Sequence, residues 1–118
     1  MELLGVHHVS LNVDDLVTTE RFYVDVLGFE RIPRPDLGFP GSWLRAGEQE
    51  VHLLEIGRVP DDVGQHVAFR VSDLDGAVAH LRDLAIEVSD PKSLPTGARQ
   101  AFLHDPSGNR LELNQPVS

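Results

Sequence analysis

The chain carries one pattern twice, and this repeat constrains the fold more than any other feature. The two copies agree at a constant offset of 58 residues, and they read His8-Val9-Ser10-Leu11-Asn12-Val13-Asp14-Asp15-Leu16 and His66-Val67-Ala68-Phe69-Arg70-Val71-Ser72-Asp73-Leu74. Any two strand–helix units share some hydrophobic pattern, but these two agree in residue identity as well as in spacing. The 118 residues are therefore interpreted as two copies of one unit of about 58 residues.

Each copy begins with alternating apolar residues, which is the pattern of a strand with one buried face. The apolar side chains are Val9, Leu11 and Val13 in the first copy and Val67, Phe69 and Val71 in the second. A capping residue then predicts the start of a helix. The candidate caps are Asp14 or Asp15 in the first copy and Ser72 or Asp73 in the second.

The first helix is expected to run to about Leu27, with Gly28 as its stop. The second has apolar residues at helical spacing from Leu74 to Leu84. Three strand-like pieces are expected after each helix, at residues 29–32, 42–46 and 51–56 and at residues 86–88, 99–104 and 110–114. Asp105-Pro106-Ser107-Gly108 predicts a turn that joins the last two strands.

The predicted fold class is therefore α+β, with two tandem βαβββ modules in one domain spanning residues 1–118. Module 1 covers about 1–57 and module 2 about 66–118, and residues 57–65 form the linker. The two long loops, 33–41 and 89–97, fall at equivalent places in the two modules.

Composition excludes several classes of function. The chain has a formal net charge of −9, which argues against a nucleic-acid partner. It contains no window of 18 apolar residues, so no membrane span is expected. The first residues do not resemble a secretory signal, and a cytoplasmic location is expected. With no cysteine, disulfides and thiolate metal sites are excluded, and six histidines remain to be explained.

The repeat selects four residues that could hold a metal ion. Val51-His52-Leu53 matches Leu111-Glu112-Leu113, so each module carries one metal-capable residue on its first strand and one on its last. These residues are His8 with His52 and His66 with Glu112. Strand alternation places them on the polar face, away from the helices. A single histidine on a strand is usually structural or solvated, but equivalent positions in a repeat favour the metal-ligand interpretation.

Imidazole nitrogens and a carboxylate oxygen suit Zn, Ni, Co, Fe or Mn better than Ca or Mg. An octahedral ion on four such ligands keeps two open positions, which is typical of a catalytic site. For His52 the alternative is a position in contact with the metal ligands instead of with the metal itself. His7 points to the opposite face from His8, although a shift of one residue in register would exchange the two.

The remaining candidates have weaker claims. His104 is a candidate for the mouth of a pocket, while His80 and Glu55 are expected at the surface. Candidate pocket walls and anion contacts are Trp43, Phe39, Arg45 and Arg99, for each of which core packing or solvated charge is the alternative.

Five stretches resemble the vicinal oxygen chelate superfamily, which includes glyoxalase I, extradiol dioxygenases and bleomycin resistance proteins. They are residues 7–16, 21–29, 51–55, 65–69 and 105–113. The resemblance implies that the two modules form a curved mixed sheet around a divalent metal ion. Carried over residue by residue, the family's ligand positions fall on His8, His52, His66 and Glu112.

The resemblance implies a metal-dependent enzyme that acts on a small substrate with adjacent oxygen atoms. In glyoxalase I the position of His52 is commonly Glu, so the proton-transferring base here would be Glu112. The set His8, His66 and Glu112 also resembles the site of extradiol dioxygenases, which is an alternative. A non-enzymatic small-molecule binding or resistance protein is another, although such members generally lack the ligands. Family members are commonly dimers, so a homodimer is expected.

Overall fold

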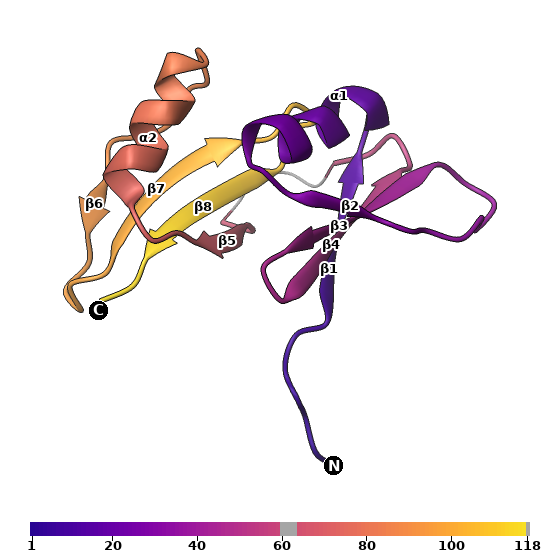
Figure 1. Ribbon diagram of the computed structural model, residues 1–118, viewed down its shortest axis with the longest axis horizontal. Coiled ribbons are helices and arrows are strands. Elements are labelled where there is room, and N and C mark those ends of the chain that lie inside the picture. The colour runs from indigo at the N-terminus through magenta and orange to yellow at the C-terminus, as the bar shows by residue number, and fades with distance from the viewer. Residues whose placement is uncertain (60–63, 118) are drawn as a thin grey trace. The chain divides into compact units, whose positions relative to one another are not determined.

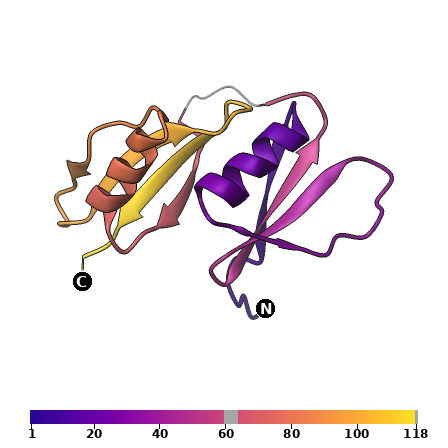
Figure 2. The ribbon, with the colours of Figure 1, turned by 45° about the horizontal axis from the view of Figure 1, so that its top comes forward.

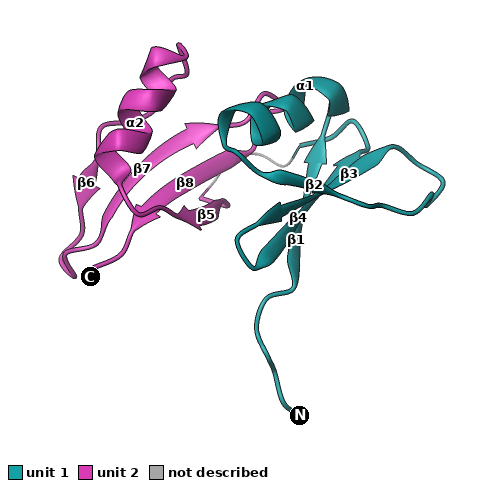
Figure 3. Cartoon of the chain, in the orientation of Figure 1, with its two compact units in different colours: residues 1–60 teal, residues 61–118 magenta. Residues whose placement is uncertain are grey.

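The computed structural model describes residues 1–59 and 64–117. The chain divides into two compact units, Met1–Pro60 and Asp61–Ser118 (Figure 3). Unit 1 contains β1 (His8–Val13), α1 (Leu16–Arg21), a π-helical turn η1 (Phe22–Val26), β2 (Glu30–Ile32), β3 (Gly41–Ala46) and β4 (Gln49–Glu55) (Figure 1). Unit 2 contains β5 (Val67–Arg70), α2 (Leu74–Asp83), β6 (Lys92–Ser93), β7 (Arg99–His104) and β8 (Arg110–Gln115).

Each unit folds into one four-stranded mixed sheet with a helix on one face (Figure 2). The strand orders are β1-β4-β3-β2 and β5-β8-β7-β6. The first strand of each unit pairs in parallel with the last, and the remaining pairs are antiparallel. The prediction of two α+β modules of the βαβββ type is confirmed. The topology sets the first and last strands side by side, and these strands carry the candidate ligands.

The core of each unit lies between the sheet and its helix. In unit 1, α1 contacts β3 and β4, and in unit 2, α2 contacts β7 and β8. The apolar side chains that alternate toward the helix are buried, and they include Val13, Leu44, Val51 and Leu53 in unit 1 and Ala101, Leu103, Leu111 and Leu113 in unit 2. The opposite face of each sheet is left for polar side chains, as the alternation predicts.

Both helices begin at an aspartate cap. Asp15 accepts a hydrogen bond from the Thr18 amide, and Asp73 accepts one from the Gly76 amide, each at 3.1 Å. These two residues are thus the caps among the alternatives given by the sequence.

A second hydrogen bond ties the first residue of each helix to the end of the last strand. The Leu16 amide donates to Glu55 Oε2 and the Leu74 amide donates to Gln115 Oε1, both at 2.7 Å. The expectation that Glu55 is only a surface residue is therefore wrong. Its carboxylate accepts one of the amide hydrogens that a helix start leaves without an intrahelical partner.

The first helix differs from the prediction of one continuous helix to Leu27. The α-helix ends at Arg21 and widens into a π-helical turn, in which the Leu27 amide donates to Phe22 O at 3.1 Å. Both adjacent aromatic residues, Phe22 and Tyr23, are buried there. Gly28 follows with a φ of +79°, a value that favours glycine, and it ends the helical segment as predicted.

The predicted strand at residues 86–88 is wrong. The Ile86 amide donates to Leu81 O at 2.9 Å and so completes the end of α2 instead of pairing in the sheet. The next residue, Ser89, contacts β7, because its amide donates to Phe102 O at 2.9 Å. The edge strand β6 forms later, at Lys92–Ser93, inside the stretch expected to be a loop.

Two further expectations concern the connections. In the turn between β7 and β8 the Gly108 amide donates to Asp105 O at 3.0 Å, which confirms the predicted hairpin. The middle of the predicted linker, residues 60–63, lies outside the described residues. Within the described part of the chain, no helix is long and apolar enough to cross a membrane.

The Asp15 cap predicts a pH-dependent contribution to stability. The hydrogen bond from the Thr18 amide, followed by that from its hydroxyl, lowers the pKa of Asp15 below its ordinary value of 3.8. The folded protein therefore holds this proton less tightly than the unfolded chain does. The stabilisation is complete above the ordinary pKa and is lost as the pH falls through the lowered value.

We expect Asp15→Asn, which keeps an acceptor oxygen but cannot ionise, to shrink the difference between urea unfolding midpoints measured at about pH 6 and about pH 3. Glu2→Gln, which removes the same charge from the exposed N-terminal segment, is the control and should leave this difference unchanged. An equal difference in wild type and Asp15→Asn would contradict the prediction.

Candidate metal centre

In unit 2 the structure brings together His66, which immediately precedes β5, and Glu112 on β8. The neighbouring strand register pairs Val67 with Leu111 and Ala68 with Glu112. His66 Nε2 lies 3.1 Å from Glu112 Oε1. Glu112 is only 7% exposed, so its carboxylate is held in a restricted position.

The outer atoms of this pair are fixed by hydrogen bonds. His66 Nδ1 lies 2.7 Å from Gly64 O, and because a carbonyl oxygen only accepts, Nδ1 must carry the hydrogen. In a neutral imidazole, Nε2 then presents a lone pair toward Glu112 Oε1. On the other side, Asn114 Nδ2 donates to Glu112 Oε2 at 2.8 Å. Such outer partners are the usual means of orienting metal ligands.

The inner atoms of the pair fit a divalent metal. Two lone-pair atoms at this distance attract each other only when a proton or another cation lies between them. With metal–ligand bonds of about 2.1 Å, adjacent ligands of an octahedral ion lie about 3.0 Å apart. The 3.1 Å between His66 Nε2 and Glu112 Oε1 is a hydrogen-bond distance and is also close to this value, so the donor pair fits the expected ion.

In unit 1 the structure brings His8 and His52 together as stacked rings. Their centroids lie 4.0 Å apart with an interplanar angle of 16°. The other face of His52 is covered by Trp43, at 4.4 Å and 8°. The three rings form a stacked column on three adjacent strands, β3, β4 and β1. Sequence reasoning names Trp43 only as a candidate pocket wall, and its stacking on a candidate ligand comes from the strand register.

Hydrogen bonds also select which nitrogen atoms of this pair remain for a metal. His52 Nε2 lies 2.9 Å from Glu50 Oε1, and since a carboxylate accepts, the hydrogen sits on Nε2 and leaves Nδ1 as the donor atom for a metal. His8 Nδ1 lies 2.9 Å from His7 Nδ1, and when His8 is the donor of this hydrogen bond its Nε2 keeps a lone pair and is the candidate ligand atom.

Glu50 is a site residue that the sequence analysis missed. The hydrogen bond from His52, together with the nearby His7, His52 and Arg45, holds the pKa of Glu50 below its ordinary value, against the opposing effect of burial. The available signal was strand alternation, because Glu50 stands two residues before His52 and so shares its face.

The four predicted ligands therefore occur as two pairs, one in each unit. Among the residues that the structure describes, no group of three or more histidine or acidic side chains is arranged to hold a metal ion. Each pair by itself provides two donor atoms, with a carboxylate or amide behind one of them.

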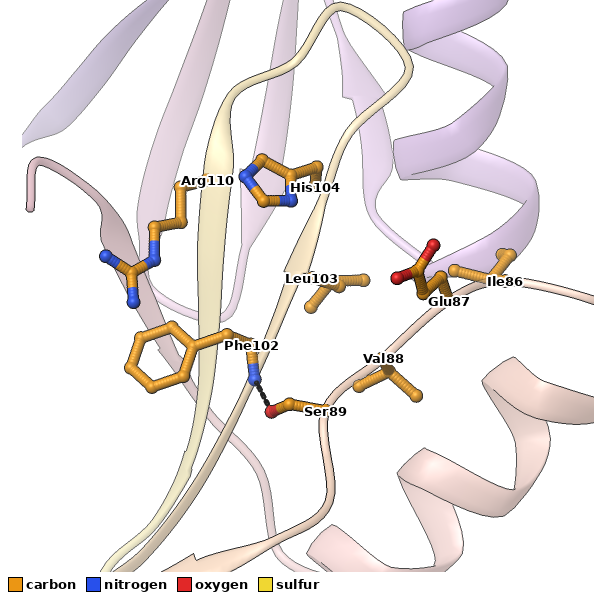
Figure 4. Close-up of a pocket in the computed structure, with 8 residues that line it drawn as sticks. All are labelled: Ile86, Glu87, Val88, Ser89, Phe102, Leu103, His104 and Arg110. Atoms are coloured by element: carbon orange, nitrogen blue, oxygen red, sulfur yellow. Dashed lines mark hydrogen bonds between the residues drawn. The ribbon is translucent and has the colours of Figure 1, made fainter. Parts of the chain in front are cut away.

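The weaker candidates have other partners. Arg99 forms a two-point ion pair with Asp75 of α2 at 2.9 Å, on the helix side of its sheet, so it is not a wall of the candidate site. Phe39 lies under the Arg34 guanidinium, 4.9 Å from its carbon, and Arg45 lies 3.9 Å from Glu30. His104 lines a pocket of about 500 Å³ in unit 2 (Figure 4).

Comparison with known proteins gives the family of this chain. Residues 5–113 match the model of the Glyoxalase/Bleomycin resistance protein/Dioxygenase superfamily. YwkD of Bacillus subtilis is 31% identical, over 96% of this chain and 98% of its own length. Glyoxylase I 4 of Arabidopsis thaliana is 28% identical, over 96% of this chain and 71% of its own length.

A solved structure agrees with this result. The structure of a glyoxalase family protein from Bacillus anthracis has a TM-score of 0.88 to this chain and 27% sequence identity, and the match covers 99% of this chain and 98% of that one. With the repeated βαβββ fold and a family model that spans nearly all residues, the chain belongs to the Glyoxalase/Bleomycin resistance protein/Dioxygenase superfamily, the vicinal oxygen chelate proteins.

Proposed function

We propose that this protein is a metal-dependent, glyoxalase-like enzyme that catalyses proton transfer on a small substrate with two adjacent oxygen atoms. The observation that carries the proposal is the His66–Glu112 pair, whose outer atoms are fixed by hydrogen bonds and whose inner atoms stand 3.1 Å apart. The similarity to Glyoxylase I 4 supports the same reaction class.

The proposed metal ligands are the pair His8 and His52 and the pair His66 and Glu112, and the proposed metal is a divalent ion such as Zn, Ni, Co, Fe or Mn. Lewis-acid stabilisation of negative charge on the substrate oxygens is the chemistry that such an ion supplies when bound. Glu50 and Asn114 orient His52 and Glu112 from behind.

Glu112 is the proposed catalytic base. It takes a proton from the substrate carbon that carries a hydroxyl group and returns it to the neighbouring carbonyl carbon. A thiol adduct of a 2-oxoaldehyde is thereby converted to a 2-hydroxy thioester, and no oxidant is consumed. His52 occupies the position where glyoxalase I commonly has Glu, so this chain has one acidic residue in the ligand set to move the proton.

An extradiol dioxygenase is the second candidate function. The set of His8, His66 and Glu112 provides the two histidines and one carboxylate that such enzymes use for iron. Oxygen uptake with a panel of catechols separates this reaction from the first. Metal-independent binding of an aromatic ligand, with no metal taken up, would instead favour a non-enzymatic binding protein.

We expect the purified chain to bind one cobalt(II) ion per chain, followed by its visible absorption. Asn114→Ala should weaken the affinity about 10–100-fold, because Glu112 loses the hydrogen bond that orients it. His66→Ala should weaken it at least as much. His80→Ala, on an exposed turn of α2, is the control. Unchanged affinity in His66→Ala would contradict the proposed centre.

We expect Glu112→Gln to abolish conversion of the hemithioacetal of methylglyoxal and glutathione while the far-ultraviolet circular dichroism stays that of wild type. The amide has nearly the same shape as the carboxylate but cannot accept the proton. Turnover is followed by formation of the thioester, with His80→Ala again as control. A Glu112→Gln variant with unimpaired turnover would exclude Glu112 as the base.

We further propose that the protein is a homodimer. The outer strands β1 and β2 of one sheet and β5 and β6 of the other present unpaired edges within their own units, and such edges favour association. Light scattering at micromolar concentration should give twice the mass of the 118-residue chain. A monomer mass would refute the proposal.

A cytoplasmic location stays a prediction from the sequence.

A further inference from the structure

Beside the His66–Glu112 pair, unit 2 contains a pocket of about 500 Å³ (Figure 4). It lies between the segment that follows α2 and the strands β7 and β8. Its lining residues are Ile86, Glu87, Val88, Ser89, Phe102, Leu103, His104 and Arg110. The proposed function uses none of these side chains, yet several of them carry hydrogen-bonding groups.

The pocket is connected to the candidate ligands through Phe102. Strand register pairs Phe102 with Glu112 and His104 with Arg110, so these side chains share the face of the sheet that carries the ligand pair. The edge of the Phe102 ring meets His66, with centroids 5.5 Å apart at 81°. The Arg110 guanidinium carbon lies 4.4 Å from the centroid of the Phe102 ring.

Arg110 is held in a form suited to binding an anion. The guanidinium group lies over the aromatic ring, which restrains it, and a guanidinium group offers N–H groups along its edge that match the two oxygens of a carboxylate. His104 stands beside it on β7 and adds a ring nitrogen. Glu87 extends from the other side of the pocket, with Leu103 and His104 between it and Arg110 in Figure 4, so an anion is directed to the Arg110 end.

Comparison between the two modules shows that Arg110 has no basic counterpart at the equivalent position of unit 1. In unit 1 the equivalent register pairs are Trp43 with His52 and Arg45 with Glu50. Trp43 of unit 1 corresponds to Phe102 of unit 2, so both units have an aromatic residue at this position. Glu50 of unit 1 corresponds to Arg110 of unit 2. Module 1 has an acid where module 2 has a guanidinium group, so the repeat does not account for Arg110.

We propose that Arg110, Phe102 and His104 form a binding site for the remote anionic end of the substrate, which rests on the proposed function for its place in catalysis. Arg110 stands two residues from Glu112 along β8, which is about 7 Å. The substrate class is therefore a small molecule whose vicinal oxygens are separated from a carboxylate by a flat apolar group about as long as one aromatic ring.

The test measures ligand binding to the full chain in the presence of a chelator, so that it does not depend on the metal. Benzoate and benzamide are the probes, because they have the same shape and differ in charge. Binding is followed by nuclear magnetic resonance at the amides of Ser89, Phe102 and Leu103. We expect wild type to bind benzoate about tenfold more tightly than benzamide, as for a charged rather than a neutral hydrogen-bonded pair.

Arg110→Gln is expected to weaken benzoate binding about tenfold and to leave benzamide binding unchanged. Arg110→Lys keeps the charge but not the planar guanidinium group, and its affinity for benzoate should fall between those of wild type and Arg110→Gln. Arg99→Gln is the matched control, because the same residue is changed in the same unit on the opposite face of β7. Equal affinities of wild type for the two probes, or equal losses in Arg110→Gln and Arg99→Gln, would overturn the proposal.

A parallel titration with cobalt(II), without chelator, separates the two proposals. A protein that binds cobalt(II) but does not prefer benzoate rejects the anion site and keeps the metal centre. A protein that prefers benzoate but binds no cobalt(II) keeps the anion site and rejects the metal centre. If Arg110→Gln does not fold, the wild-type comparison of the two probes and the Arg110→Lys variant still decide the outcome.

Discussion

The parallel pairing of the first and last strands is the constraint on which the rest of each unit depends. It sets β1 beside β4 and β5 beside β8, with residues that are more than 40 positions apart in the sequence on the same sheet face. Parallel pairing requires a connection that leaves the sheet and returns, and the helix supplies it. The same pairing joins His8 to His52 and His66 to Glu112. Fold and candidate site therefore follow from one register.

Hydrogen bonds to the outer atoms of the candidate ligands distinguish this arrangement from a chance contact between polar side chains. Gly64 O, Asn114 and Glu50 each engage the outer atom of a ligand and so determine which atom is presented inward. His52, His66 and Glu112 thus each lose part of their rotational freedom. The stacking of His8, His52 and Trp43 restrains unit 1 in a different way, through contact between ring faces.

Sequence reasoning predicted the elements whose signals are local. Period-two alternation located β1 and β5, and the capping residues located both helix starts, because each depends on neighbouring side chains. It failed where a hydrogen-bond partner outside the local pattern determines the structure. The Ile86 amide is used by Leu81 instead of by a strand, and Glu55 caps a helix 39 residues away. Repetition selected the four candidate ligands, whereas the Glu50 and Asn114 contacts became clear only from the sheet register. The π-helical turn at Phe22 had no local signal that we can identify.

The stacked column of unit 1 has a spectroscopic consequence. The chain has one tryptophan and one tyrosine, Trp43 and Tyr23, and both belong to unit 1. All intrinsic fluorescence above that of phenylalanine therefore originates in one half of the molecule. Emission from Trp43 reports directly on the ring of His52, while unit 2 is silent in the same spectrum. One of the two units thus contains an intrinsic fluorophore, which allows the folding of that unit to be followed without chemical modification.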